Sequence, residues 1–290
     1  MVARRQSLRG DGANSGIGFE VALGLARLGA AVVLLCRRRV EGERARRSIL
    51  AQQPRADVSV ITCDLSDPAS VRLAAAQLLR QWPRLDVLVH NAGATFRERR
   101  LTPAGVEMTL AVDVVGPFLL TAFVCHRLER CGGRVMTLTG ISQRKGWADV
   151  SDLNFAHRPY HWLRANAQAQ RGRFLFMSEL ARRAPRLTTA AVHPGAVRAA
   201  AQSRLPMAVR VLLATVLRPM FVRAELGAIP VLRLAAQPEP PASGRFFDRC
   251  CATSDVADPD VARAYWAACE ELTGESWPTA PRALNAALAS

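Results

Sequence analysis

Short apolar runs alternate with longer amphipathic stretches along the chain, and this alternation predicts strands followed by helices. The runs expected to form strands are Ala31–Cys36, Val58–Cys63, Val87–His90, Arg134–Thr139 and Thr189–His193. The stretches expected to form helices are Ile17–Leu28, Gly42–Gln53, Ala69–Gln81, Val106–Leu128 and His161–Arg183. Continuously apolar strands between helices are typical of a parallel sheet covered on both faces. We therefore expect a three-layer α/β fold, a doubly wound parallel sheet in a single domain.

The charge of the chain is strongly positive, but its distribution argues against nucleic acid as a partner. The formal net charge is +15, and Lys145 is the only lysine, so nearly all the positive charge is arginine. The arginines are scattered among alanines along the whole chain, and no nucleic-acid-binding motif accompanies them. We expect no nucleic-acid partner.

The seven cysteines indicate reduced thiols. None forms a C-x-x-C pair, and Cys36 and Cys63 lie in apolar runs that predict buried strands. This pattern favours neither a disulfide framework nor a metal site. No run reaches about 20 apolar residues, and the first twelve residues are basic and polar. We expect a protein that is intracellular, either cytoplasmic or peripheral to a membrane.

A glycine-rich segment opens the first expected helix, with Gly12, Gly16 and Gly18 in the spacing G-x-x-x-G-x-G. Glycines let the backbone turn tightly and approach a pyrophosphate, which the free N–H groups at a helix N-terminus attract. Ser15 and Ile17 belong to the same segment and are candidate cofactor contacts.

Three further motifs directly follow strand candidates, where a doubly wound sheet binds its ligand. In chain order they are Asp64-Leu65, Asn91-Ala92-Gly93 and His193-Pro194-Gly195. The Asp64 carboxylate could accept a hydrogen bond from an adenine amino group. We take Asp64, Leu65, Asn91, Ala92, Gly93, Pro194 and Gly195 as candidate cofactor-binding residues.

In this order and spacing, the motifs resemble those of the short-chain dehydrogenase/reductase family. Segments such as GANSGIGFEVALGLARLGA, RLDVLVHNAG and AVHPGAV, with a closing SGRFFDRC and EELTG, resemble its retinol-dehydrogenase-like branch. The similarity runs from about Gly12 to Gly274. It implies a Rossmann-type fold with a seven-stranded parallel sheet, a nicotinamide cofactor and oxidoreduction of retinoid or lipid alcohols and carbonyls. We expect the domain at 1–274, with an atypical first strand at 5–11, a substrate lid at about 203–222 and a flexible tail at 275–290.

The residues that this family uses for catalysis are all replaced. Its motif A-Y-x-x-S-K-L-A-N-V-L-F falls on residues 165–176, which puts Asn166 at the tyrosine that delivers a proton and Gln170 at the lysine. Gly140 stands at the serine that binds substrate, and Asp113 stands at the asparagine of the proton relay. An asparagine has no titratable proton near neutrality, and a glutamine has no charge with which to lower a pKa.

Substitute groups are few. Tyr160 and Tyr265 are the only tyrosines, so with a single lysine no Y-x-x-x-K motif exists. Tyr160 has Arg164 four residues on, but it lies six residues before the family position, on a different helix face. Thr139 and Ser142 flank Gly140 and could offer a hydroxyl, although packing is the expected role of both.

The cofactor site departs from the family as well. Where the family has an apolar first strand, this chain reads Gln6–Gly12, with charges at Arg9 and Asp11. Burying those charges costs several kcal/mol unless they are paired. Ala199 replaces the hydroxyl residue that meets the nicotinamide amide in the family. We therefore expect weakened cofactor binding.

The cofactor expected is NADP(H). The second family strand ends in Arg37-Arg38-Arg39, with no acid to bind a ribose 2′-hydroxyl. Arginines there suit a 2′-phosphate, and Arg37 is the strongest candidate. The alternative is a set of surface arginines in an arginine-rich chain.

Three hypotheses follow. The first is a retinol-dehydrogenase-like protein with a weakened NADP site and little or no activity. The second is an active NADP-dependent oxidoreductase that uses Tyr160 or Thr139. The third is a dinucleotide-sensing or scaffolding protein. A small retinoid or lipid substrate and a homo-oligomer are further expectations. The apolar segment 205–221 is expected to be the lid, with an amphipathic membrane-surface helix as its alternative.

Overall fold

The computed structural model describes residues 16–195 and 222–277. Strands alternate with helices through most of the described residues. Each of the five expected strands is present within one residue of its expected bounds. The strands are β1 (Val32–Cys36), β2 (Val58–Thr62), β3 (Val87–His90), β4 (Arg134–Leu138), β5 (Thr188–His193), β6 (Arg245–Asp248) and β7 (Cys251–Ala252).

The five expected helices are also present, together with two further helices after residue 222. The α-helices are α1 (Ile17–Arg27), α2 (Arg39–Gln52), α3 (Pro68–Gln81), α4 (Met108–Leu110), α5 (Gly116–Arg130), α6 (Trp162–Arg183), α8 (Ala224–Ala236) and α9 (Pro259–Thr273). Two 3-10 turns are η2 (Ile141–Lys145) and η3 (Val150–Asp152). The stretch expected as one helix over Val106–Leu128 begins at Met108 and contains a π-helical turn, η1 (Ala111–Val115).

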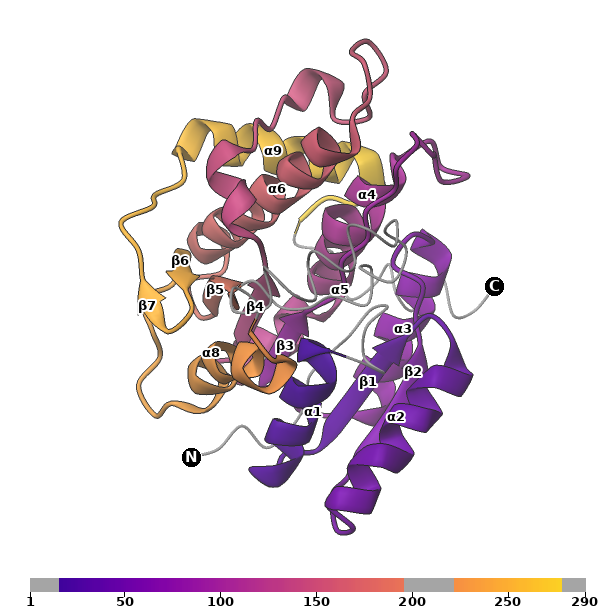
Figure 1. Ribbon diagram of the computed structural model, residues 1–290, viewed down its shortest axis with the longest axis vertical. Coiled ribbons are helices and arrows are strands. Elements are labelled where there is room, and N and C mark those ends of the chain that lie inside the picture. Colours follow the sequence, from indigo (N-terminus) through magenta and orange to yellow (C-terminus); the bar gives the residue numbers. More distant parts are fainter. Residues whose placement is uncertain (1–15, 196–221, 278–290) are drawn as a thin grey trace, which may run out of the picture.

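The described strands hydrogen-bond as two sheets. β1 pairs with β2 in parallel, and β3, β4, β5 and β6 form a parallel array in that order. The two-residue β7 pairs antiparallel with β6, whereas β1 to β6 all pair in parallel; the expected first strand at 5–11 lies outside the described residues. The doubly wound parallel sheet itself is confirmed, and Figure 1 shows helices on both sides of it.

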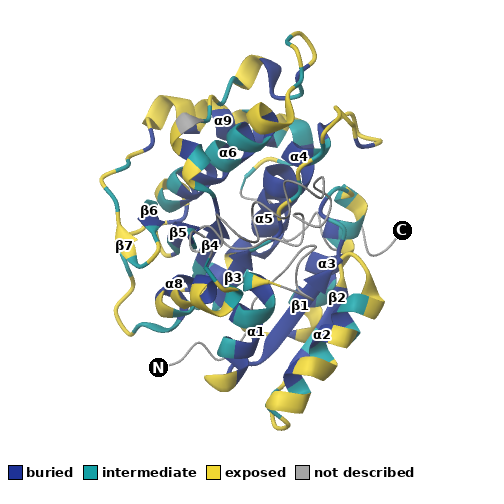
Figure 2. Ribbon diagram, viewed as in Figure 1, coloured by how far each residue is buried: buried dark blue, intermediate teal, exposed yellow. Residues whose placement is uncertain are grey.

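Side chains alternate between two apolar clusters along each strand, as the period of two requires. On β1, Leu34 belongs to the cluster beneath α1, α2 and α8, whereas Val33 and Leu35 belong to the cluster beneath α3, α5 and α6. Val87 of β3 shares the first cluster with Leu34, so the two sheets cover one continuous core. These clusters form the interfaces of the three layers, and Figure 2 shows the strands buried between the helices.

One helical stretch among the described residues is long and apolar enough to cross a membrane by length and composition, namely Met108–Arg130. However, 94% of its most apolar window is buried inside the fold. Phe118 and Leu119 pack in the cluster beneath α3 and α6, so packing against the sheet accounts for the apolar character of this helix.

Several expectations fall outside the described residues. These are the first strand at 5–11 with Arg9 and Asp11, the candidate contacts Gly12 and Ser15, Ala199, the lid at about 203–222 except its last residue, and the tail beyond residue 277.

Candidate active site

The structure places the described motif residues after the carboxyl ends of the strands. Gly16 precedes α1, and the remaining motif residues follow strands, namely Arg37 after β1, Asp64 and Leu65 after β2, Asn91, Ala92 and Gly93 after β3, Gly140 after β4, and Pro194 and Gly195 after β5. Parallel strands bring these ends to one edge of a sheet. The family positions on helices, Asp113 and Asn166 with Gln170, lie on η1 and α6.

The N-terminus of α1 has the features of an anion site. Gly16 has φ +72°, a conformation that favours glycine, and a Cβ there would meet no atom within 4 Å among the described residues. Gly16 at the N-cap offers no side chain to the helix, so among the residues 16–195 and 222–277 no cap hydrogen bond to its first N–H groups is recorded from this position. Ile17 and Gly18 form the first turn. This end of the helix therefore fits a pyrophosphate.

The adenine end of the expected cofactor site is also polar. Asp64 accepts hydrogen bonds at Oδ1 from the Ser66 N–H (2.9 Å) and from the Ser66 hydroxyl (2.6 Å), which fixes the orientation of its carboxylate. Arg37 is exposed directly after β1. Arg38 and Arg39 are also exposed, and they contact acids of α2, Glu41 and Glu43 respectively.

A buried ion pair occupies the ends of β3 and β4. Arg173 of α6 contacts Asp113 of η1, with 3.1 Å between Nη2 and Oδ2, and their side chains are only 4% and 1% exposed. The guanidinium also donates to the carbonyls of Asp113, at 3.0 Å from Nε, and of Leu138 and Ala92. Asp113 Oδ1 accepts from the Ala94 N–H at 2.8 Å. One guanidinium therefore joins η1, α6 and two strand ends.

Arg173 was not singled out from the sequence, although a signal existed. The family motif has an asparagine at position 173, as it has at position 113, so this chain replaces two amides with two opposite charges. Either charge alone would be buried without compensation, at a cost of several kcal/mol. Burial raises the pKa of Asp113 to about 6, although the Arg173 guanidinium and the Ala94 N–H oppose this rise. The two substitutions therefore compensate each other.

A chain of hydrogen bonds connects the other three family positions. Gln170 Oε1 accepts from the Gly140 N–H at 2.8 Å and lies 2.9 Å from the Thr139 hydroxyl. Gln170 Nε2 donates to Asn166 Oδ1 at 3.3 Å. The structure thus brings Gly140, Asn166 and Gln170 together, as the resemblance implies. Every group that takes part in these hydrogen bonds is an uncharged amide, hydroxyl or backbone group.

Both tyrosines are held by contacts within the described structure. The Tyr160 hydroxyl donates to the Phe96 carbonyl at 2.7 Å and lies 3.3 Å from Glu107 Oε1. Burial, followed by the charge of Glu107, raises the pKa of Tyr160. Tyr265 of α9 is fully buried against Gly172, where an added Cβ would lie 2.0 Å from its hydroxyl. The Tyr160 hydroxyl is thus hydrogen-bonded within the fold, and the Tyr265 side chain is enclosed by it.

His90, at the end of β3 next to the Asn91-Ala92-Gly93 motif, is buried beside this site. Its Nε2 lies 2.8 Å from the Thr121 hydroxyl. Burial, together with the positive charge of Arg173, lowers the pKa of His90 to about 3. The histidine is therefore neutral in the folded protein at physiological pH.

We expect His90 to make the protein sensitive to acid. The unfolded chain binds a proton below pH 6.5, whereas the folded chain does not do so until about pH 3, so the free energy of unfolding falls as pH falls through this window. Between pH 6.5 and 4.5 the loss is about 2–3 kcal/mol. His90→Gln, which keeps a partner for Thr121, should lose less stability over this range in urea titrations. His126→Gln, at an exposed histidine, is the control; equal acid sensitivity of all three proteins would contradict the prediction.

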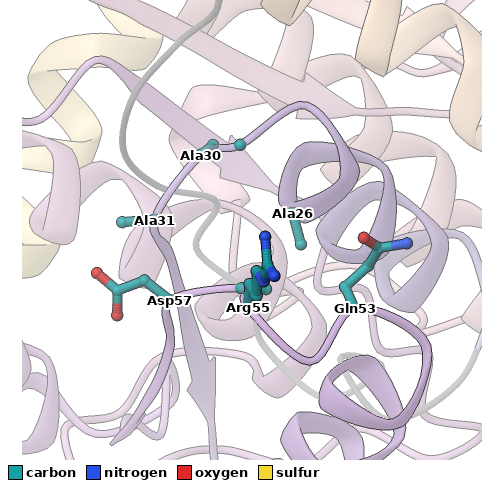
Figure 3. A pocket seen from close by; sticks show the side chains of 8 residues that line it. Ala26, Ala30, Ala31, Gln53, Arg55 and Asp57 are labelled. Atoms are coloured by element: carbon teal, nitrogen blue, oxygen red, sulfur yellow. The ribbon is translucent and has the colours of Figure 1, made fainter.

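A separate pocket of about 420 Å³ lies at the opposite end of the first sheet (Figure 3). Its lining comes from the end of α1 and from the residues before β1 and β2, namely Ala26, Gly29, Ala30, Ala31, Gln53, Arg55, Ala56 and Asp57. Because it lies at the amino ends of β1 and β2, it is distinct from the edge that carries the motifs. Among the described residues, no three His, Cys, Asp or Glu side chains group as a metal site would require.

Comparisons with known proteins agree with the motifs. A family model described as enoyl-(acyl carrier protein) reductase matches residues 12–157. Human retinol dehydrogenase 13 is 32% identical over 279 residues, with 92% of this chain and 84% of that protein covered. Dehydrogenase/reductase SDR family member 13 of Bos taurus is 36% identical, with 92% and 74% covered, and retinol dehydrogenase 12 of Mus musculus is 34% identical, with 92% and 85% covered.

Solved structures show the same architecture. An uncharacterised protein from Mycobacterium paratuberculosis aligns with a TM-score of 0.74 at 31% identity, over 95% of this chain and 96% of that chain. A short-chain dehydrogenase/reductase from Serratia marcescens aligns with a TM-score of 0.67 at 21% identity, over 85% and 96%, and shows similarity of fold alone.

Proposed function

Because the chain belongs to the short-chain dehydrogenase/reductase family, in its retinol-dehydrogenase-like branch, we propose that it is an NADP(H)-binding member with little or no oxidoreductase activity. The family uses a nicotinamide dinucleotide, which exchanges a hydride with the substrate when bound. The observation that carries the proposal is the series of hydrogen bonds between uncharged groups, from Gly140 through Gln170 to Asn166. None of the groups in this series of hydrogen bonds can give up a proton near neutrality.

The site fits one half of the dinucleotide better than the other. The N-terminus of α1 would hold the pyrophosphate, and Asp64 would hold the adenine. Arg37 would meet a 2′-phosphate. At the nicotinamide ribose, Gln170 stands in place of the family lysine and supplies no charge. This combination supports cofactor binding that is weaker than in the family and selective for the phosphorylated cofactor.

The alternative of an active enzyme needs another acid. The Tyr160 hydroxyl already donates to the Phe96 carbonyl, and Thr139 lies within hydrogen-bonding distance of two oxygens of Gln170. A hydroxyl engaged in this way is poorly placed to protonate a substrate oxygen. General acid–base assistance typically contributes about 10²–10⁴ in rate, so its loss is sufficient to make turnover very slow.

We expect the protein to bind NADPH more tightly than NADH and to oxidise neither with retinal or small ketones. Calorimetric titration measures the binding, and loss of the absorbance of the reduced nicotinamide measures the turnover. Binding without turnover supports the proposal and also the dinucleotide-sensing alternative. Binding with turnover would establish the active enzyme, and absence of binding would reject both cofactor hypotheses.

Arg37→Ser provides the matched test of cofactor selectivity. A charge-assisted hydrogen bond contributes about 1.5–3 kcal/mol, so NADPH affinity should fall by about 10–100-fold while NADH affinity changes little. Arg47→Ser, at an exposed arginine of α2, is the control and should change neither. Tighter binding of NADH than of NADPH by the unaltered protein would refute the assignment.

A further inference from the structure

We infer that the loops beside the N-terminus of α6 dock on the surface of an anionic lipid bilayer. The described residues expose thirteen large apolar side chains, and four of these lie between residues 147 and 163. A fifth lies on the neighbouring loop between β3 and α4. We call these five residues the loop-end surface, which consists of Leu101, Trp147, Val150, Trp162 and Leu163. The inference does not depend on the proposed function, because none of these side chains takes part in the series of hydrogen bonds described above.

The segment that precedes α6 folds back along that helix. A Cβ built on Gly146 would overlap the carbonyl oxygen of Ala167, so the backbone of this segment touches the second turn of α6. Trp147 is the next residue of the segment. Leu163 precedes Ala167 by four residues, so it lies about one helical turn away on the same face of α6. Trp147 and Leu163 therefore emerge beside the same two turns of the helix.

The loop between β3 and α4 lies against the same segment. The Tyr160 hydroxyl donates to the Phe96 carbonyl at 2.7 Å, and Arg99 Nε donates to the Asn154 carbonyl at 2.8 Å. Trp162 follows Tyr160 by two residues, so the arginine-rich stretch after Phe96 borders the apolar side chains. Figure 1 shows both loops projecting at the end of the molecule where α6 begins, and Figure 2 shows exposed residues along both.

The charge around the loop-end surface is positive. Arg97, Arg99 and Arg164 are exposed, and none of them forms an ion pair within residues 16–195 and 222–277. The acids of the two loops have other partners, in the pairs Glu98–Arg100 and Asp152–Arg158 and in the hydrogen bonds from Ser151 to Asp149. The three arginines would repel a second copy of this surface, whereas an anionic bilayer attracts them. Each basic residue near such a membrane raises the affinity about fivefold.

Tryptophan is the apolar residue that best suits the boundary between lipid and water, because its ring is apolar and its N–H is polar. Trp147 is 77% exposed and Trp162 is 37% exposed. Arginine stems can lie along the apolar region while their guanidinium groups stay among the phosphates. The loops also project outward, whereas a stable protein interface needs roughly 800 Å² of complementary surface on each partner. These features together favour a bilayer as the occupant.

The test uses the full chain and vesicles of phosphatidylcholine, with or without phosphatidylserine. Sedimentation of the vesicles measures binding, and quenching of tryptophan fluorescence by lipids with brominated acyl chains shows whether the rings enter the bilayer. We expect the protein to bind the vesicles that contain phosphatidylserine, to be released by added salt, and to show quenching that Trp147→Ser reduces.

Two double variants test the apolar and the charged parts separately. Trp147→Ser with Leu163→Ser removes two apolar side chains and should weaken binding by about tenfold or more. Arg97→Ser with Arg164→Ser should weaken binding to the anionic vesicles by about 25-fold. The matched controls, at exposed positions away from the two loops, are Leu73→Ser on α3 and Arg44→Ser with Arg47→Ser on α2; they should leave binding unchanged.

Several results would overturn the inference. Absence of vesicle binding, or equal binding to vesicles with and without phosphatidylserine, would reject the anionic bilayer as the occupant. Binding that neither double variant weakens would place the contact on another part of the chain. Self-association in light scattering that Trp147→Ser abolishes would identify a second copy as the occupant. Circular dichroism confirms that each variant is folded, and all the substituted side chains are exposed.

Discussion

Arg173→Met should destabilise the protein by about 3–5 kcal/mol at pH 8, which is a large part of the 5–15 kcal/mol that typically holds a folded chain together. The substitution keeps most of the side-chain volume but leaves the Asp113 carboxylate buried with the Ala94 N–H as its recorded partner. It also removes the donor that joins the carbonyls of Ala92 and Leu138 to α6. Urea titration measures the loss.

The cost should depend on pH in a way that identifies Asp113 as the cause. The pKa of Asp113 is already raised to about 6 in the folded protein, from an ordinary value of 3.8. A raised carboxyl pKa means that the folded state holds the proton more tightly, so this group's contribution to stability falls as pH rises from about 4 to 6. Without the guanidinium the pKa of Asp113 rises further, so the destabilisation in Arg173→Met should shrink as pH falls.

Asp113→Asn should show the complementary behaviour. Arg173 cannot lose its proton, so the cost of leaving it unpaired should be nearly independent of pH. Asp113→Asn with Arg173→Asn restores the two amides of the family motif and should cost less than the sum of the single changes. Arg182→Met, at a half-exposed ion pair on the same helix, is the control and should cost at most about 1 kcal/mol. Additive costs for the two buried changes would show that the pair is not a unit.

The sequence predicted the fold well where each element carries its own pattern. β1 is apolar at every position, and α3 starts at Pro68, within one residue of its expected start, where the Asp67 side chain caps it. β6 was not predicted from its pattern, because only Phe246 and Phe247 of its four residues are buried. Its place depends on pairing with β5, which is information from distant parts of the chain. The π-helical turn at η1 is likewise not visible in a helical period.

The candidate site shows the same division. The resemblance located Gly140, Asn166 and Gln170, and the structure brings them into one hydrogen-bonded chain. The partner of Asp113 could not be obtained by examining Asp113 alone. Arg173 is 60 positions away in the sequence, and only the packing of η1 on α6 brings the two charges together. A search for opposite charges at two family asparagines would have found the pair.

The buried pair also determines how activity could be restored. Replacing Asp113, Gly140, Asn166 and Gln170 by the family's Asn, Ser, Tyr and Lys leaves Arg173 buried without its partner, in contact with the ends of β3 and β4. We expect this fourfold variant to be unstable and nearly inactive. A fivefold variant that adds Arg173→Asn removes the uncompensated charge. Gly140→Ser is compatible with the backbone, because residue 140 has φ −101° and the nearest neighbour, the Ser142 hydroxyl, can rotate away.

The fivefold variant should therefore oxidise NADPH with retinal at least about 10²-fold faster than the unaltered chain. This is the lower end of the roughly 10²–10⁴-fold that a positioned general acid contributes. The gain should far exceed the product of the separate changes, because the acid, its cation, the serine and the relay amide act as a unit. NADPH oxidation is compared at equal folded fraction, measured by circular dichroism, with the fourfold variant as the control. Equal activity of the two would show that Arg173 does not obstruct the site. If the fivefold variant folds, binds NADPH and stays inactive, the cause lies at Asp11 and Ala199. These two positions differ from the family and are unchanged in the fivefold variant.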